Sequence, residues 1–176
     1  AGARLWFQVY AWRDRDLIRT MVERAAAANF EALCLTVDTA VLGRRERDVR
    51  RGLTLPPEIG PGTFIDGLRH PGWTWRFLRS DPIRFANVEG SDRVGGGSGD
   101  GSTAVDLSAY MGSQFDHALS WKDVEWLRSV WEGPVLVKGI QTVADAVLAV
   151  EHGVDAVILS NHGGRQLDGA PVPFDL

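Results

Sequence analysis

Cysteine is nearly absent from this sequence: Cys34 is the one cysteine among 176 residues. A single thiol cannot form a disulfide within the chain, so a disulfide-stapled fold is excluded and a reducing compartment is compatible with the sequence. Cys34 lies in the apolar run 32–35, where we interpret it as a small buried side chain and not as a nucleophile.

Long apolar runs and an excess of positive charge are also missing. No apolar stretch reaches the roughly 18 residues of a membrane-spanning helix, and we expect neither a membrane span nor a secretory signal peptide. The 19 Lys and Arg residues are outnumbered by 23 Asp and Glu residues, which does not favour a nucleic-acid partner. No spacing of His, Cys and acidic residues indicates a metal site. With 44% hydrophobic and 24% charged residues, the composition is that of an ordinary globular protein.

Apolar runs do alternate with amphipathic helical patterns toward both ends of the chain. Ser120 and Thr142 each precede a helical pattern and have an aspartate three residues further on, an arrangement typical of a helix N-cap. Strands made of continuous Val, Ile and Leu predict a parallel sheet buried on both faces. We therefore predict an α/β fold, a (β/α)8 TIM barrel of which the chain covers roughly the central half. The predicted strands are 5–10, 30–38, 134–138 and 154–160, and the predicted helices are 16–28, 121–131 and 143–152.

The middle of the chain, about 43–119, interrupts this alternation, and we treat it as a long excursion within a single partial barrel of residues 1–176. Its segment 90–102 is rich in Gly and Ser and typical of a flexible linker, whether natural or engineered. A nearby aromatic patch predicts a short helix that packs on the barrel or covers its mouth, with attachment to a membrane surface as the alternative. This patch consists of Trp73, Trp75, Phe77 and Leu78.

Polar side chains follow every predicted strand, and the last strand is followed by His162, Gly163, Gly164 and Arg165. The carboxyl ends of parallel strands are where α/β proteins place their chemistry. Histidine transfers protons near neutral pH, and arginine clamps a carboxylate through two hydrogen bonds. The sequence therefore predicts a site that binds a small acid and removes a proton from it. The last strand also supplies Ser160, and the other strand ends supply Gln8, Tyr10, Thr36, Asp38 and Lys138.

These segments resemble the FMN-dependent α-hydroxy acid dehydrogenase/oxidase family, which includes glycolate oxidase, lactate oxidase, mandelate dehydrogenase, flavocytochrome b2 and the bacterial quinone-linked L-lactate dehydrogenases. The resemblance covers nearly the whole chain except about 86–104, and SNHGGRQLD at 160–168 is its most specific part. Residues 108–173 are most similar to the bacterial L-lactate dehydrogenases. The other segments are FQVY (7–10), LTVDT (35–39), LGRRE (42–46), LSWKDVEWL (119–127) and LVKGI (136–140).

The resemblance implies the roles of the residues on the substrate side. His162 would be the catalytic base, and Asp38 would orient it and stabilise its protonated form. Arg45 and Arg165 would bind the substrate carboxylate, and Tyr10 would hydrogen-bond the substrate. Spacing alone does not separate Arg45 from the adjacent Arg44, which the family pattern directs away from the substrate.

The resemblance also implies the residues that face the cofactor, FMN. Gln8 and Thr36 would contact the flavin ring. Lys138 would lie near the flavin N1–C2 carbonyl, where negative charge accumulates on reduction. Ser160 is a further residue on the flavin side.

The implied reaction is the two-electron oxidation of an L-2-hydroxy acid to a 2-oxo acid, with L-lactate first and glycolate or mandelate as alternatives. His162 would remove a proton from the hydroxyl if hydride is transferred, or from the α-carbon if a carbanion forms. A quinone, a cytochrome or oxygen would take the electrons. We expect a cytoplasmic protein, peripheral on the inner face of the cytoplasmic membrane in one alternative, and a homo-oligomer at full length.

Part of the implied cofactor site falls outside these residues. The family binds the FMN phosphate on strands that would follow Leu176, and a further substrate tyrosine would precede Ala1. We therefore expect the 176 residues alone to be inactive and unstable, because a half barrel exposes strand edges. One alternative is a non-catalytic barrel fragment that binds no FMN. Another is a phosphate-binding barrel enzyme similar to IMP dehydrogenase, which the absence of a cysteine in a suitable loop disfavours.

Overall fold

The computed structural model describes residues 3–39, 43, 46–50, 60–80 and 113–176. The chain forms two compact units, one of Ala1–Arg44 with Gln114–Leu176 and one of Arg45–Ser113. Each unit is described by itself.

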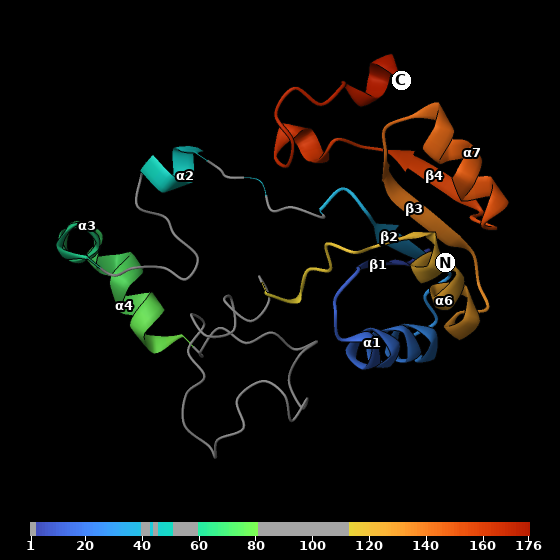
Figure 1. The fold of residues 1–176 in the computed structure, drawn as a ribbon. Helices are drawn as coiled ribbons and strands as arrows, with labels where there is room; N and C mark the ends of the chain where they lie inside the picture. Colours follow the sequence, from blue (N-terminus) through green and yellow to red (C-terminus); the bar gives the residue numbers. More distant parts are fainter. Residues whose placement is uncertain (1–2, 40–42, 44–45, 51–59, 81–112) are drawn as a thin grey trace. The chain divides into compact units, whose positions relative to one another are not determined.

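Four parallel strands form the sheet of the first unit, in chain order. The strands are β1 (Trp6–Tyr10), β2 (Ala32–Thr36), β3 (Val135–Ile140) and β4 (Ala156–Leu159), and the helices are α1 (Arg15–Ala27), α6 (Trp121–Val130) and α7 (Val143–Glu151). Figure 1 shows α1 and α6 beside β1 and β2, with α7 beside β3 and β4. The prediction of a parallel α/β sheet is confirmed, and each element ends within two residues of its predicted bounds.

Local hydrogen bonds begin the helices where the sequence predicted. The carboxylate of Asp14 accepts the backbone N–H three residues further on, at 3.0 Å, and so caps α1. The N–H of Ser120 donates to the Asp123 carboxylate at 2.7 Å before α6. Thr142 Oγ1 accepts the N–H of Asp145 at 3.0 Å before α7. These caps need no tertiary contact, which is why the sequence alone locates the helix starts.

The two faces of the sheet carry different side chains, because residues alternate across a strand. Leu33 and Leu35 of β2 are buried on the face toward the helices, together with Val135 and Val137 of β3. The opposite face holds a small apolar cluster of Ala32, Cys34, Leu136 and Ile158. Cys34 is buried there as predicted, and burial raises the pKa of its thiol, as does the Asp38 charge, while Lys138 opposes the rise.

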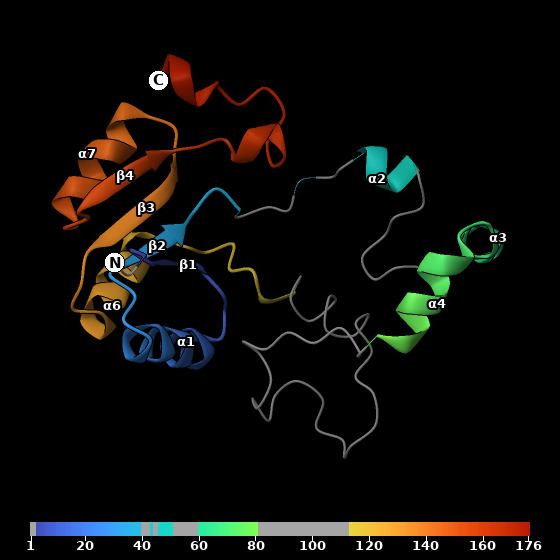
Figure 2. The same ribbon diagram turned by 180° about the vertical axis from the view of Figure 1, so that it is seen from behind.

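Burial of every strand on both faces, which the sequence predicted, is wrong for the outer strands. All five residues of β2 are buried, whereas Trp6 of β1 is 56% exposed and Leu159 of β4 is 43% exposed. Among the described residues β1 pairs along its length with β2 alone and β4 with β3 alone, so each presents one open edge. Figure 2 shows the same sheet from behind.

The second unit contains three described helices: α2 (Glu46–Arg50), α3 (Pro61–Arg69) and α4 (Pro71–Arg79). The helix predicted from the aromatic patch is confirmed as α4, and Trp73 stacks on Phe77 along it with ring centroids 5.1 Å apart. The Gly/Ser-rich segment 90–102 lies outside the described residues. Of the described helices, none combines the length and apolarity that a bilayer crossing requires.

Candidate active site

Three polar residues occupy paired positions on adjacent strands, in one row across the carboxyl end of the sheet. The register places Tyr10 of β1 opposite Thr36 of β2, and Thr36 opposite Lys138 of β3. Gln8 lies two residues before Tyr10 and therefore on the same face. The parallel register thus brings together side chains that are up to 130 positions apart in the sequence.

The β1 end of this row is joined by hydrogen bonds. Gln8 Nε2 donates to Thr36 Oγ1 at 2.7 Å and to the Tyr10 hydroxyl at 3.2 Å. The Tyr10 ring packs edge-on against Phe115, with centroids 5.9 Å apart. Burial raises the pKa of Tyr10, and the nearby negative charge of Asp38 raises it further. Tyr10 therefore keeps its proton at neutral pH and can donate a hydrogen bond.

Asp38 and His162 form a pair at the end of the sheet. Asp38 follows β2, His162 follows β4, and Asp38 Oδ1 lies 3.0 Å from His162 Nδ1. The Asp38 side chain is 2% exposed and the His162 side chain is 21% exposed. A carboxylate that accepts the Nδ1–H leaves the lone pair of the imidazole on Nε2. The pair can therefore accept a proton at Nε2 and stabilise the resulting imidazolium.

Ser160 connects this pair to Lys138. Lys138 Nζ donates to Ser160 Oγ at 3.0 Å, and Ser160 Oγ donates to Asp38 Oδ2 at 3.1 Å. Lys138 Nζ lies 3.5 Å from the same carboxylate oxygen. The structure thus brings Asp38, Lys138, Ser160 and His162 into one network, as expected for strand ends that converge.

The loop after β4 is held in a tight turn, the 3₁₀ segment His162–Gly164. Asn161 Oδ1 accepts the N–H groups of Gly163 and Gly164 at 3.1 and 3.2 Å. His162 has a φ of +58°, which a non-glycine residue rarely adopts. Arg165 follows the turn, is exposed and makes no ion pair with any residue that the structure describes. Its side chain is therefore exposed at the end of the turn that carries His162.

Gly139 is part of the site, although the sequence analysis gave it no role. The pairing of β3 with β4 shifts register between Lys138 and Ile140, which makes Gly139 the extra residue of a bulge. Its φ is +111°, and a Cβ built on it would lie 2.7 Å from both the Cβ and the backbone N of Asp38. Only glycine allows Asp38 to approach β3 this closely. Glycine directly after a strand-end lysine is the signal that could have found it.

Gly43 makes a second close contact that the sequence analysis missed. Its N–H donates to Gln166 Oε1 at 2.7 Å, and a Cβ at Gly43 would overlap the Arg165 carbonyl. Arg44 and Arg45 lie outside the described residues, so the predicted role of Arg45 rests on the sequence. Gly43 itself is held against the loop that carries Arg165.

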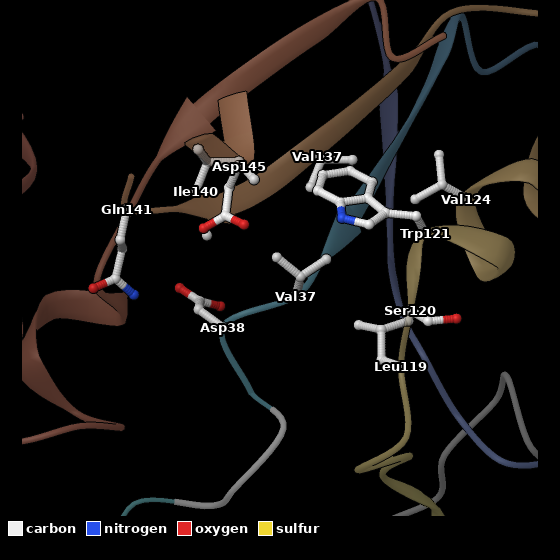
Figure 3. Close-up of a pocket in the computed structure, with 11 residues that line it drawn as sticks. Val37, Asp38, Leu119, Ser120, Trp121, Val124, Val137, Ile140, Gln141 and Asp145 are labelled. Carbon is white, nitrogen blue, oxygen red and sulfur yellow. The ribbon is translucent and has the colours of Figure 1, made fainter. Parts of the chain in front are cut away.

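A cavity of about 400 Å³ lies beside Asp38, between the strand ends and the N-terminal ends of α6 and α7. Figure 3 shows the Asp38 carboxylate near Gln141 and Asp145, with apolar side chains and Trp121 across from them. Of the predicted site residues that the structure describes, Asp38 is the one that lines this cavity. The cavity is therefore distinct from the face of the sheet that carries Tyr10, Thr36 and Lys138.

The chain matches proteins of known family along its whole length. The family model described as FMN-dependent dehydrogenase matches residues 1–176. A relative from Mycobacterium tuberculosis is 46% identical over 173 residues, and the L-lactate dehydrogenase of Chromohalobacter salexigens is 42% identical over 168 residues. These alignments cover 98% and 95% of this chain but 39% and 41% of the two relatives. The chain therefore spans about two fifths of the length of the curated relatives it matches.

Solved structures show the same fold. The monotopic membrane protein (S)-mandelate dehydrogenase superposes with a TM-score of 0.85 at 36% identity, over 100% of this chain and 45% of that one. The flavin-binding domain of baker's yeast flavocytochrome b2 superposes with a TM-score of 0.61 at 26% identity, over 98% of this chain and 31% of that one. The strands described above are thus part of the barrel that these enzymes share.

Proposed function

This chain belongs to the FMN-dependent dehydrogenase family, and on that basis we propose that the protein oxidises an L-2-hydroxy acid to the 2-oxo acid. Relatives named L-lactate dehydrogenases, 39–42% identical to this chain, support L-lactate as the first substrate to test. Glycolate and mandelate are the alternatives.

The observation that carries the proposal is the Asp38–His162 pair. A buried carboxylate 3.0 Å from the Nδ1 of a partly exposed imidazole is the arrangement of a general base with its orienting group. In the proposed reaction His162 Nε2 accepts one proton from the substrate, and Asp38 stabilises the positive charge that forms on the ring. The 3.0 Å contact between Asp38 and His162 supports this assignment, because the orienting carboxylate is already in place.

The substrate carboxylate is assigned to arginine. Arg165 is exposed three residues after His162, and Arg45 follows by two positions Gly43, whose N–H donates to Gln166 on the same loop. A guanidinium binds a carboxylate through two parallel hydrogen bonds, which fixes the orientation of a small acid. Tyr10 keeps its proton and supplies a neutral hydrogen-bond donor on the face of the sheet that also carries Gln8, Thr36 and Lys138.

The polar groups on that face, donors and acceptors together, match the hydrogen-bonding edge of a flavin. Gln8 offers an amide, Thr36 a hydroxyl and Lys138 an ammonium, all on one face of adjacent strands. We assign Gln8 and Thr36 to hydrogen bonding with the ring and Lys138 to its electron-rich end. FMN, when bound, accepts the two electrons of the oxidation.

The experiment is flavin reduction in the complete polypeptide that carries this chain. L-lactate added without oxygen bleaches the flavin absorbance, whereas the His162→Ala variant retains FMN and is not reduced. His70→Ala, a histidine of the second unit that contacts Asp66, is the matched control and is reduced like the parent. No bleaching with lactate, glycolate or mandelate would contradict the proposed function. Quinone, cytochrome c and oxygen, supplied in turn to the reduced protein, then identify the electron acceptor.

The alternative is a catalytically incomplete barrel that binds no FMN. The chain covers 39–41% of the length of two relatives, which favours this alternative for the 176-residue chain in isolation. Equilibrium dialysis of this chain against excess FMN separates the two hypotheses. No uptake by the 176 residues, with uptake by the complete polypeptide, assigns the remaining flavin contacts to the rest of the family barrel.

We also propose that α3 and α4 contact an anionic membrane surface. Their apolar side chains are at least half exposed, and Arg69, Arg76 and Arg79 outnumber the single carboxylate, Asp66. Arg79 lies over the Trp75 ring, 4.3 Å from its centroid. Aromatic and basic residues on one short helix favour the headgroup region of a bilayer. The exposed apolar side chains are Phe64, Ile65, Leu68, Trp73, Trp75, Phe77 and Leu78.

Co-sedimentation with vesicles tests this contact. We expect binding to vesicles that contain phosphatidylglycerol and weaker binding to pure phosphatidylcholine. The Phe77→Ala variant weakens binding, whereas Phe174→Ala, an exposed phenylalanine of the first unit, does not. Equal binding of both variants would show that the patch does not contact lipid.

A further inference from the structure

We propose that Ser160 is a positioning residue that fixes the Asp38–His162 pair and links it to Lys138. The effect of Ser160 on catalysis rests on the proposed function, but its effect on the conformation of His162 can be measured without any turnover. The flavin-side role of Ser160 stays a prediction, and in addition its hydroxyl makes three hydrogen bonds to protein groups.

The hydroxyl of Ser160 uses its full hydrogen-bonding capacity. A serine hydroxyl has one donor and two acceptor positions. Ser160 Oγ donates to Asp38 Oδ2 at 3.1 Å and accepts from Lys138 Nζ and from the His162 N–H, each at 3.0 Å. These contacts join the ends of β2, β3 and β4 at a single atom.

The first consequence is the orientation of the Asp38 carboxylate. Ser160 holds Oδ2, so that Oδ1 faces the Nδ1 of His162 at 3.0 Å. Lys138 Nζ is 3.5 Å from Oδ2 and 3.0 Å from Ser160 Oγ, so the serine is the closer partner of the ammonium. Without the Ser160 hydroxyl, Asp38 Oδ2 keeps Lys138 Nζ as its remaining polar neighbour in this network. Lys138 then moves toward Asp38, and the carboxylate turns away from the imidazole.

The second consequence is the backbone conformation of His162. Its φ of +58° lies in the left-handed region, which few non-glycine residues adopt, and neighbouring groups help to hold it there. The bond from the His162 N–H to Ser160 Oγ closes a turn over two residues and stabilises this conformation. Ser160 therefore fixes His162 twice, through its backbone and through the carboxylate that orients its ring.

The test is the tautomer of His162, measured by ¹⁵N NMR on the histidine-labelled complete polypeptide without substrate. The parent protein shows a single tautomer protonated at Nδ1. Ser160→Ala shows a mixture of both tautomers, and Ser160→Thr, which keeps the hydroxyl, restores the single form. Ser129→Ala removes a serine hydroxyl that bonds the Trp126 carbonyl on the surface of α6, and it leaves the His162 signal unchanged.

Turnover provides a second readout. In Ser160→Ala we expect kcat to fall about 10- to 100-fold with KM changed by less than about threefold, because the base is displaced while the arginine clamp remains. Ser160→Thr recovers most of kcat. Should Ser160→Ala fail to fold, Ser160→Cys replaces it, since a thiol has similar size but is a weak hydrogen-bonding group.

The outcomes separate the two proposals. An unchanged tautomer and unchanged kcat in Ser160→Ala or Ser160→Cys would overturn the positioning role. A tautomer change in a protein whose flavin no hydroxy acid reduces would support the role of Ser160 and contradict the proposed function.

Discussion

Substitution of Gly139 by alanine is the sharpest test of how Asp38 is positioned. Gly139 combines a φ of +111° with a space too small for a methyl group, since the nearest Asp38 atoms would lie at 2.7 Å. The contacts are to the backbone N and Cβ of Asp38, which cannot rotate away as the end of a long side chain can. Alanine at this position must therefore move the end of β2, the bulge of β3, or both.

Two energy terms contribute to the expected loss of stability. A non-glycine residue in a rare backbone conformation costs about 1–3 kcal/mol. Overlap of an added methyl group with a packed neighbour costs about 1–3 kcal/mol more. The free energy of unfolding should then fall by about 2–6 kcal/mol, which is a large share of the stability of an ordinary domain.

Gly153→Ala is the matched control for the backbone term. Gly153 has a φ of +74° at the end of α7, but a Cβ there would meet its nearest atom, Arg128 Nε, at 3.7 Å, an ordinary contact. This variant carries the left-handed strain alone, about 1–2 kcal/mol. The difference between the two variants therefore measures the collision with Asp38 together with the greater backbone strain at a φ of +111°.

Urea unfolding of the complete polypeptide measures both variants. With a denaturant dependence of about 2 kcal/mol/M, the midpoint should fall by about 1–3 M for Gly139→Ala and by about 0.5–1 M for Gly153→Ala. Reduction of the flavin by L-lactate should be impaired in Gly139→Ala alone, because Asp38 is displaced from His162. Equal midpoints for the two variants, with full activity in both, would refute the close approach of Gly139 to Asp38.

Three further predictions follow from single contacts. Asp38→Asn removes the negative charge beside the imidazole and should lower kcat by about 10²- to 10⁴-fold with FMN still bound, as measured by stopped-flow flavin reduction; unchanged kcat would exclude an electrostatic role. Gly43→Ala displaces the Arg165 carbonyl and should raise KM for L-lactate more than it lowers kcat, a split that steady-state kinetics detects. The pKa of Asp155 is lowered mainly by a hydrogen bond from the Val135 N–H, so its contribution to stability is present above the unfolded pKa of about 3.9 and is lost as pH falls through the folded pKa. The urea midpoints of the parent and Asp155→Asn should therefore differ at pH 6 and converge on acidification below about pH 4; a gap independent of pH would contradict this assignment.

Much of the fold could be predicted because its signals are local. Continuous apolar runs identify the strands, and caps such as Ser120 with Asp123 begin helices through contacts three residues apart. Burial could not be predicted in the same way. Trp6 of β1 and Leu159 of β4 lie in apolar runs like those of β2, yet both are exposed, because burial depends on which elements pack on each side of a strand.

The sequence by itself determined the chemical inventory of the site: a histidine, an arginine and glycines after one strand, with an aspartate and a lysine after two others. It also determined the resemblance to the FMN-dependent family, since SNHGGRQLD is a contiguous motif. Only the tertiary structure decided how these groups meet. Asp38 and His162 are 124 positions apart and pair because β2, β3 and β4 run parallel in a single register. The bulge at Gly139 and the three bonds of Ser160 depend on that register to within one residue, and a pattern of side-chain types along the chain does not specify it.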